Sequence, residues 1–119
     1  RLDWDELEAN LLIFDDLCLD CDGISDLISL YLDREGLSHR YLQGSVLDTL
    51  GGDLVSPHCW IEIDGRVIDF RLRKWLAHDD RVPHGLFVPT DQFRYCGVPV
   101  HRPRQDWVAL GLAYPMNRL

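Results

Sequence analysis

The chain has 119 residues, of which 46% are hydrophobic, and carries a formal net charge of −8 with a pI near 4.9. This length is sufficient for one core that needs neither metal nor disulfides, so we expect residues 1–119 to form a single domain. The acidic charge disfavours electrostatic binding to nucleic acid or to an anionic membrane. No apolar run is long enough to span a bilayer.

The N-terminus and the cysteines bear on the cellular setting. The chain begins at Arg1 without a methionine and shows no signal peptide, so we expect a trimmed chain or a piece of a longer protein. Its four cysteines could form two disulfides in three pairings. Because a core of this size does not need them, we favour reduced thiols and a cytoplasmic protein. The sequence leaves the oligomeric state open.

Two amphipathic helices are predicted in the first third of the chain. Residues 3–17 place an apolar face at spacings of three and four, and an acidic face opposite it. Cys18 falls on the apolar face, so we expect it in the core. A second helix follows a break at 17–23, with Cys21 at or just before its first turn and Gly36 as its C-terminal stop.

The rest of the chain is expected to form mainly strands. Residues 37–47 are a strand candidate interrupted by Gly44, and residues 49–57 are predicted to be a loop because they contain two glycines and Pro57. Residues 71–77 favour a short helix or turn, residues 78–85 a polar loop, and residues 87–89 and 92–100 one or two edge strands. Residues 106–113 are expected to form a closing helix. Segregated helices and antiparallel strands indicate an α+β fold.

Residues 58–69 are typical of a β-hairpin. β-Branched and aromatic residues flank Asp64-Gly65, the dipeptide favoured in a two-residue type I′ turn. Facing residues in this register have position numbers that add to 129, which makes His58 and Asp69 diagonal neighbours on one face. Such neighbours lie about 7–8 Å apart at the backbone, so a carboxylate can reach an imidazole.

Cys21, His58 and Asp69 together supply the parts of a cysteine nucleophile. A helix N-terminus lowers a thiol pKa, and a histidine can take the proton and return it to a leaving group. A carboxylate on the far ring nitrogen fixes the tautomer and stabilises the imidazolium. Asp20 and Asp22 oppose this scheme, because nearby negative charge raises a thiol pKa.

These residues resemble the transglutaminase-like superfamily of papain-like cysteine enzymes. There, a cysteine opens a helix that ends at a glycine, and a glycine-containing strand, H-x-W-x-E, a D-G or similar turn and an aspartate follow. The corresponding residues here are Cys21, Gly36, Gly44, His58-x-Trp60-x-Glu62, Asp64-Gly65 and Asp69. The match covers residues 21–69, and it departs from the family at Leu19, Cys59 and Phe70, where glycine, alanine and proline are common.

The resemblance implies a papain-like core, with N-terminal helices packed on an antiparallel sheet, and a Cys21-His58-Asp69 catalytic triad. It implies a thiol protease or amidase/deamidase that hydrolyses amide bonds in a peptide or protein substrate through a thioester, without a cofactor. The backbone N–H of Cys21 is a candidate oxyanion donor. Transglutaminase-type acyl transfer and a non-catalytic protein-binding module that retains the fold remain alternatives.

Several residues have competing interpretations. Cys18-x-x-Cys21 with His58 and Cys59 has zinc-ligand residue types, but adjacent strand residues point to opposite faces, which disfavours one shared ion. Trp60 is expected in the core beside the site. Glu62 is expected to pair with a basic residue, Arg40 or Arg71. The remaining histidines, His39, His78, His84 and His101, are expected in surface or loop positions.

Overall fold

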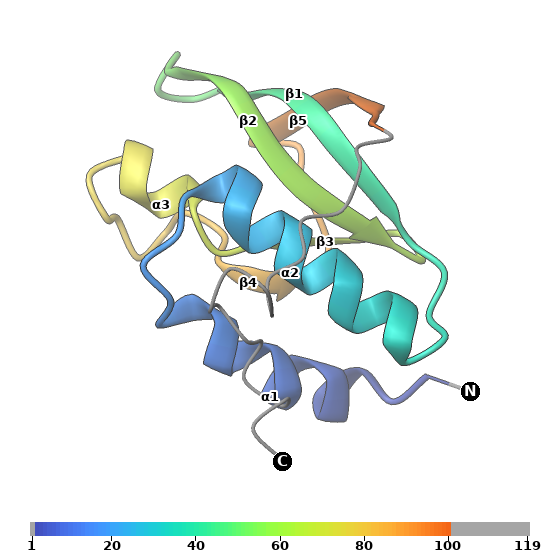
Figure 1. Ribbon diagram of the computed structural model, residues 1–119. Helices are drawn as coiled ribbons and strands as arrows, with labels where there is room; N and C mark the ends of the chain where they lie inside the picture. Colours follow the sequence, from blue (N-terminus) through green and yellow to red (C-terminus); the bar gives the residue numbers. More distant parts are fainter. Residues whose placement is uncertain (1, 101–119) are drawn as a thin grey trace.

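The computed structural model describes residues 2–100, and its order of elements is helix, helix, then sheet (Figure 1). The elements are α1 (Trp4–Asp15), α2 (Cys21–Arg34), β1 (Arg40–Asp48), β2 (Leu54–Ile63), β3 (Arg66–Asp69), α3 (Leu72–Trp75), β4 (Gly85–Phe87) and β5 (Phe93–Pro99). The strands form one antiparallel sheet in the order β4-β3-β2-β1-β5. The α+β prediction is therefore confirmed. The helix predicted at 106–113 lies outside the described residues, as does His101.

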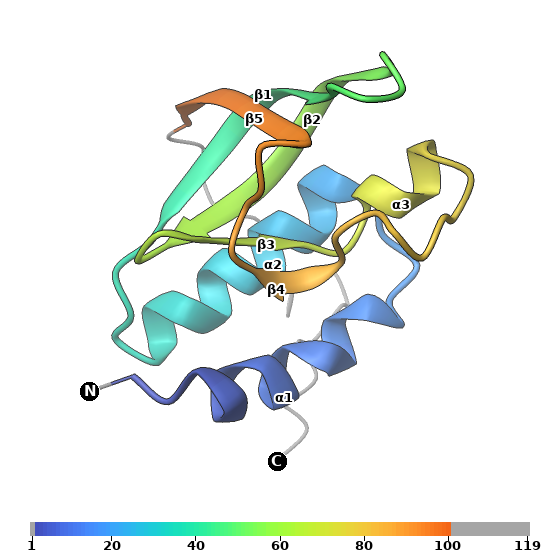
Figure 2. The same ribbon diagram turned by 180° about the vertical axis from the view of Figure 1, so that it is seen from behind.

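Two apolar clusters lie on the two faces of the sheet. One contains the apolar faces of α1 and α2 packed on Ile61, Ile63 and Ile68. The other contains Trp60 and Val67 with residues of β1, β5 and α3. Neighbouring residues of β2 and β3 alternate between the clusters because strand side chains point to opposite faces in turn. Both views show α2 against the sheet and α1 outside it (Figures 1 and 2).

One end of α1 is capped by a side chain, and one end of α2 is stopped by a glycine. Asp3 caps α1 by accepting from the backbone N–H groups of Asp5 and Glu6. At the C-terminal end of α2, Gly36 adopts φ +71°, and the N–H of Leu37 donates to the carbonyl of Leu32 at 2.9 Å. This left-handed stop confirms the predicted role of Gly36. None of these helices is both long and apolar enough to cross a membrane.

Three local predictions were wrong. Helix α1 ends at Asp15, so Cys18 lies beyond it and is exposed rather than in the core. Gly44 does not end β1, which runs from Arg40 to Asp48, although the pairing of β1 with β2 shifts register between Gly44 and Val46. A Cβ at Gly44 would lie 2.0 Å from the carbonyl oxygen of Cys96 in β5, so this glycine permits a close approach of two strands. Finally, β2 begins at Leu54 and includes Pro57, which was assigned to a loop.

The hairpin of β2 and β3 has the predicted register. Ile61 pairs with Ile68, and Ile63 pairs with Arg66. Asp64 and Gly65 have φ values of +47° and +81°, as a type I′ turn requires. The hairpin therefore brings His58 of β2 close to Asp69 at the end of β3.

Candidate active site

His58 and Asp69 form a buried hydrogen-bonded pair. The imidazole Nε2 lies 2.7 Å from Asp69 Oδ2, and the two side chains are 0% and 1% exposed. The pairing register between β2 and β3 explains the contact, because it puts the two side chains on the same face of the hairpin. The sequence predicted this proximity from the hairpin turn alone.

Asp69 is held by four hydrogen bonds. Its Oδ1 accepts from the backbone N–H groups of Arg71 and Leu72 at 2.9 and 3.1 Å, which turns the chain into α3. Its Oδ2 accepts from His58 and from the Tyr95 hydroxyl, the latter at 2.8 Å. A carboxylate held by four hydrogen bonds has one orientation towards the ring.

Tyr95 is a site residue that sequence reasoning missed. It lies on β5, on the opposite side of β1 from β2, and its ring packs edge-on to Trp60 with centroids 4.9 Å apart. Burial, together with the charge and hydrogen bond of Asp69, raises the pKa of Tyr95 well above its usual range. The phenol therefore remains a hydrogen-bond donor to Asp69 throughout the neutral range. No local sequence signal connects residue 95 with residue 69.

Cys21 is the first residue of α2 and lies against residues 58–59 of β2. A hydrogen bond from the Cys59 thiol lowers the pKa of Cys21, burial opposes this, and a hydrogen bond and the charge of His58 lower it further, to about 5. The backbone N–H of Cys59 also contributes. The helix N-terminus favours the same charged form. These interactions outweigh Asp20 and Asp22, and the thiolate is the favoured form at neutral pH.

The pKa of His58 shifts in the complementary direction. Burial lowers it, but hydrogen bonds with Asp69 and Cys21 and the charges of both raise it to about 9. The ring nitrogen that does not contact Asp69, Nδ1, is buried and has no hydrogen bond of regular geometry. Its interaction with Cys21 is thus looser than the bond to Asp69, as is common for catalytic pairs without substrate. Between about pH 5 and 9, the favoured state is a thiolate–imidazolium pair.

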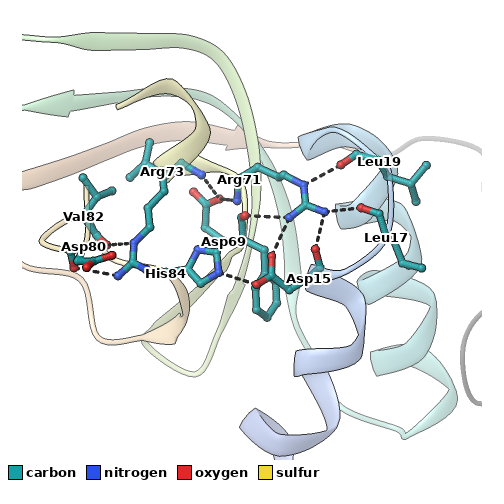
Figure 3. Close-up of polar contacts among 11 residues, drawn as sticks. Asp15, Leu17, Leu19, Asp69, Arg71, Arg73, Asp80, Val82 and His84 are labelled. Carbon is teal, nitrogen blue, oxygen red and sulfur yellow. Dashed lines mark hydrogen bonds and ion pairs between the residues drawn. The ribbon is translucent and has the colours of Figure 1, made fainter. Parts of the chain in front are cut away.

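Arg71 fixes the segment that leads into Cys21 (Figure 3). Its guanidinium donates to the carbonyl oxygens of Leu17 and Leu19 at 2.8 and 2.7 Å. It also bonds the carboxylate of Asp15 at 3.0 Å and the carbonyls of Asp15 and Phe70. Because the backbone N–H of Arg71 bonds Asp69, one residue ties the acid of the site to the loop that precedes the thiol. Sequence analysis did not predict this role.

The other ionic predictions had mixed outcomes. Glu62 pairs with Arg40, one of the two partners expected for it. His84 was expected to be a loop residue without a specific role, but its Nε2 lies 2.8 Å from Asp15, which also binds Arg71 (Figure 3). His39, expected in a surface or loop position, lies in the loop before β1, where its side chain is 5% exposed and bonds Ser29 at 2.6 Å. Trp60 is 1% exposed and stacks beside His58, so it is a core residue next to the site as predicted.

Metal chemistry finds no support in the described part of the chain. No group of three or more histidine, cysteine or acidic side chains between residues 2 and 100 is placed to hold an ion. The four cysteines have free thiols. Cys59 interacts with Cys21 as a hydrogen-bond partner.

Comparisons of the chain with protein-family models, with curated proteins and with solved structures found no match.

Proposed function

We propose that this protein is a cysteine hydrolase that cleaves amide bonds in peptides or proteins, with Cys21 as nucleophile. The observation that carries the proposal is the linked geometry of three residues: Cys21 at a helix N-terminus, His58 interacting with it, and Asp69 bonded to the far ring nitrogen at 2.7 Å. Nucleophile, base and orienting acid in this order are the requirements of thiol-based acyl transfer.

The reaction would proceed in two halves. The Cys21 thiolate attacks the amide carbonyl carbon, and the carbonyl oxygen takes the negative charge. The intermediate collapses to a thioester as His58 gives its proton to the departing amine. In the second half neutral His58 takes a proton from water, the hydroxide oxygen bonds to the acyl carbon, and the thiolate leaves. In the first turn of α2 the backbone N–H of Gly23 donates to the Asp22 carboxylate at 2.8 Å, so the N–H of Cys21 is the candidate donor to the oxyanion.

The resemblance of residues 21–69 to transglutaminase-like enzymes supports the same proposal. It extends the observed α+β arrangement to a papain-like core, in which the cysteine helix packs on the antiparallel sheet. If an amine replaced water in the second half, the same residues would perform acyl transfer.

A thiol-reactive amide probe, such as iodoacetamide, tests the proposal and contains its own controls. Cys18 and Cys96 are exposed, whereas Cys21 is partly buried, so accessibility alone predicts faster labelling at Cys18 and Cys96. We expect the opposite order at pH 7, with Cys21 modified first, because the thiolate is the nucleophile. Site-resolved mass spectrometry gives the three rates in one sample.

Replacement of the histidine separates an enzyme from a non-catalytic module. His58→Ala should slow labelling at Cys21 and leave the rates at Cys18 and Cys96 unchanged. Two results together would favour a non-catalytic protein-binding module. Cys21 would be labelled more slowly than Cys18 in the unaltered protein, and His58→Ala would not change the rate at Cys21.

A further inference from the structure

A groove beside the candidate active site has no role in the chemistry above. Its volume is about 1090 Å³, and it lies between the loop joining β1 to β2 and helix α3. In both views these two segments project at the same end of the molecule, near the beginning of α2 (Figures 1 and 2). The groove is large enough for two or three side chains of a peptide.

Both walls of the groove connect directly to the site. One wall includes Ser56 and Pro57, so it ends one residue, about 3.3 Å along the strand, before His58. The other wall includes Trp75. The ammonium of the preceding residue, Lys74, lies 5.3 Å from the Trp75 ring and contacts the carboxylate of Asp20, the residue before the nucleophile. A chain lying in the groove would therefore lead towards the thiol.

The groove has an apolar surface that water covers in the isolated chain. Val55, Val82 and Phe93 form buried parts of its lining. Leu50 and Trp75 expose 81% and 57% of their surface at its rim, and Leu54 exposes 62%. A single exposed leucine needs no explanation, but three large apolar side chains around one concavity mark a binding surface.

The charged residues that line the groove determine which charge on an apolar ligand is favoured. Asp48, Asp53 and Asp79 line it together with one guanidinium, Arg81, which leaves two net negative charges. Arg81 is already bonded to Asp79 at 2.7 Å. Hydrogen bonds, first from the backbone of Gly51, lower the pKa of Asp48, so this carboxylate is ionised at neutral pH. An acidic ligand would be repelled, and a cationic group would be attracted.

We propose that this groove binds a substrate segment in which a large apolar side chain is adjacent to a lysine or arginine. The apolar side chain packs against Trp75 and Leu54, and the cation lies near Asp48 and Asp53. This assignment rests on the hydrolase function proposed above, because it takes the occupant to be a peptide leading to Cys21. The groove thereby determines which amide bonds reach the thiolate.

The test measures binding rather than turnover, so it does not depend on the chemistry. The protein carries Cys21→Ala, and calorimetry measures its affinity for capped Gly-Lys-Leu-Phe-Gly-amide. Two matched probes replace lysine by glutamate, or leucine and phenylalanine by serine. We expect both replacements to weaken binding, and the effect of glutamate to shrink as salt is added.

Variants of the protein locate the binding. Trp75→Ala should weaken binding about ten-fold, as expected for a large aromatic contact. Asp53→Asn should weaken binding of the lysine probe. It should not weaken binding of an analogue in which glutamine replaces the lysine of the probe. Val98→Ala is the matched control, since Val98 is 65% exposed on β5 and does not line the groove, and it should leave affinity unchanged.

Each alternative outcome is decisive. Equal affinity for the lysine and glutamate probes, or no effect of Trp75→Ala, would overturn the assignment. A concentration-dependent dimer that Trp75→Ala dissociates would give the groove to a second copy of this chain instead. Selective peptide binding together with slow labelling of Cys21 would refute the hydrolase proposal and support the groove as a peptide site. Fast labelling of Cys21 without peptide binding would support the hydrolase proposal and refute the assignment of the groove.

Discussion

Replacing Arg71 by methionine should destabilise the protein far more than the same change at a surface arginine. The Arg71 side chain is 10% exposed and makes five hydrogen bonds, four of them to Asp15, Leu17 and Leu19 (Figure 3). Methionine fills a similar space but leaves these acceptors without a donor in a part-buried site. Breaking a buried pair in this way costs about 3–5 kcal/mol.

The control for this prediction is Arg40→Met. Arg40 also forms an ion pair, with Glu62, but its side chain is 59% exposed. A surface pair of this kind contributes at most about 1 kcal/mol. In thermal unfolding, Arg71→Met should lower the Tm by about 10–20 °C, and Arg40→Met should lower it by only a few degrees. Equal shifts for the two variants would refute the structural reasoning, because they would show that the five contacts add nothing beyond surface charge.

Three further predictions follow from contacts elsewhere in the sheet. Gly44→Ala should cost more than about 2 kcal/mol in urea unfolding, because a Cβ there meets a carbonyl of β5 at 2.0 Å; an unchanged free energy of unfolding would count against the strand packing. Tyr95→Phe should lower the free energy of unfolding by about 1–2 kcal/mol, because it removes a buried hydrogen bond, and an unchanged value would argue against that bond. Cys59→Ala should raise the pKa of Cys21, measured by alkylation rate against pH, because the largest stabilising hydrogen bond is lost; no shift would exclude the Cys59 thiol as donor.

Local signals were sufficient for the part of the site that one hairpin builds. Asp64-Gly65 fixes the turn, the turn fixes the register, and the register brings His58 to Asp69. The start of α2 at Cys21 was also predictable, because a polar break precedes an apolar periodicity. Each of these inferences uses residues that are close in sequence or joined by one tight turn.

Contacts between distant segments were not predictable by the same reasoning. Tyr95 reaches Asp69 across 26 positions, and Arg71 reaches Leu17 across 54. Nothing in a single sequence pairs these residues, since their contact depends on the order of strands in the sheet. The error at Gly44 has the same origin. A glycine within a strand pattern locally indicates a break, whereas here glycine is needed because the neighbouring strand β5 approaches closely.

Cys18 illustrates a different failure. Helical periodicity placed it on the apolar face of α1, but the helix ends three residues earlier, at Asp15. The carbonyls of Leu17 and Leu19, beyond this point, bond to Arg71 instead of continuing the helix. A tertiary contact thus overrode a local pattern, as helix ends often allow.

The rate of Cys21 alkylation as a function of pH tests the central claim most directly. With the pKa of Cys21 lowered to about 5 and that of His58 raised to about 9, the rate should already be near its plateau at pH 7. The midpoint should lie near pH 5, and His58→Ala should move it upward. A midpoint in the ordinary thiol range of about 8.5, unchanged by His58→Ala, would contradict the thiolate–imidazolium pair.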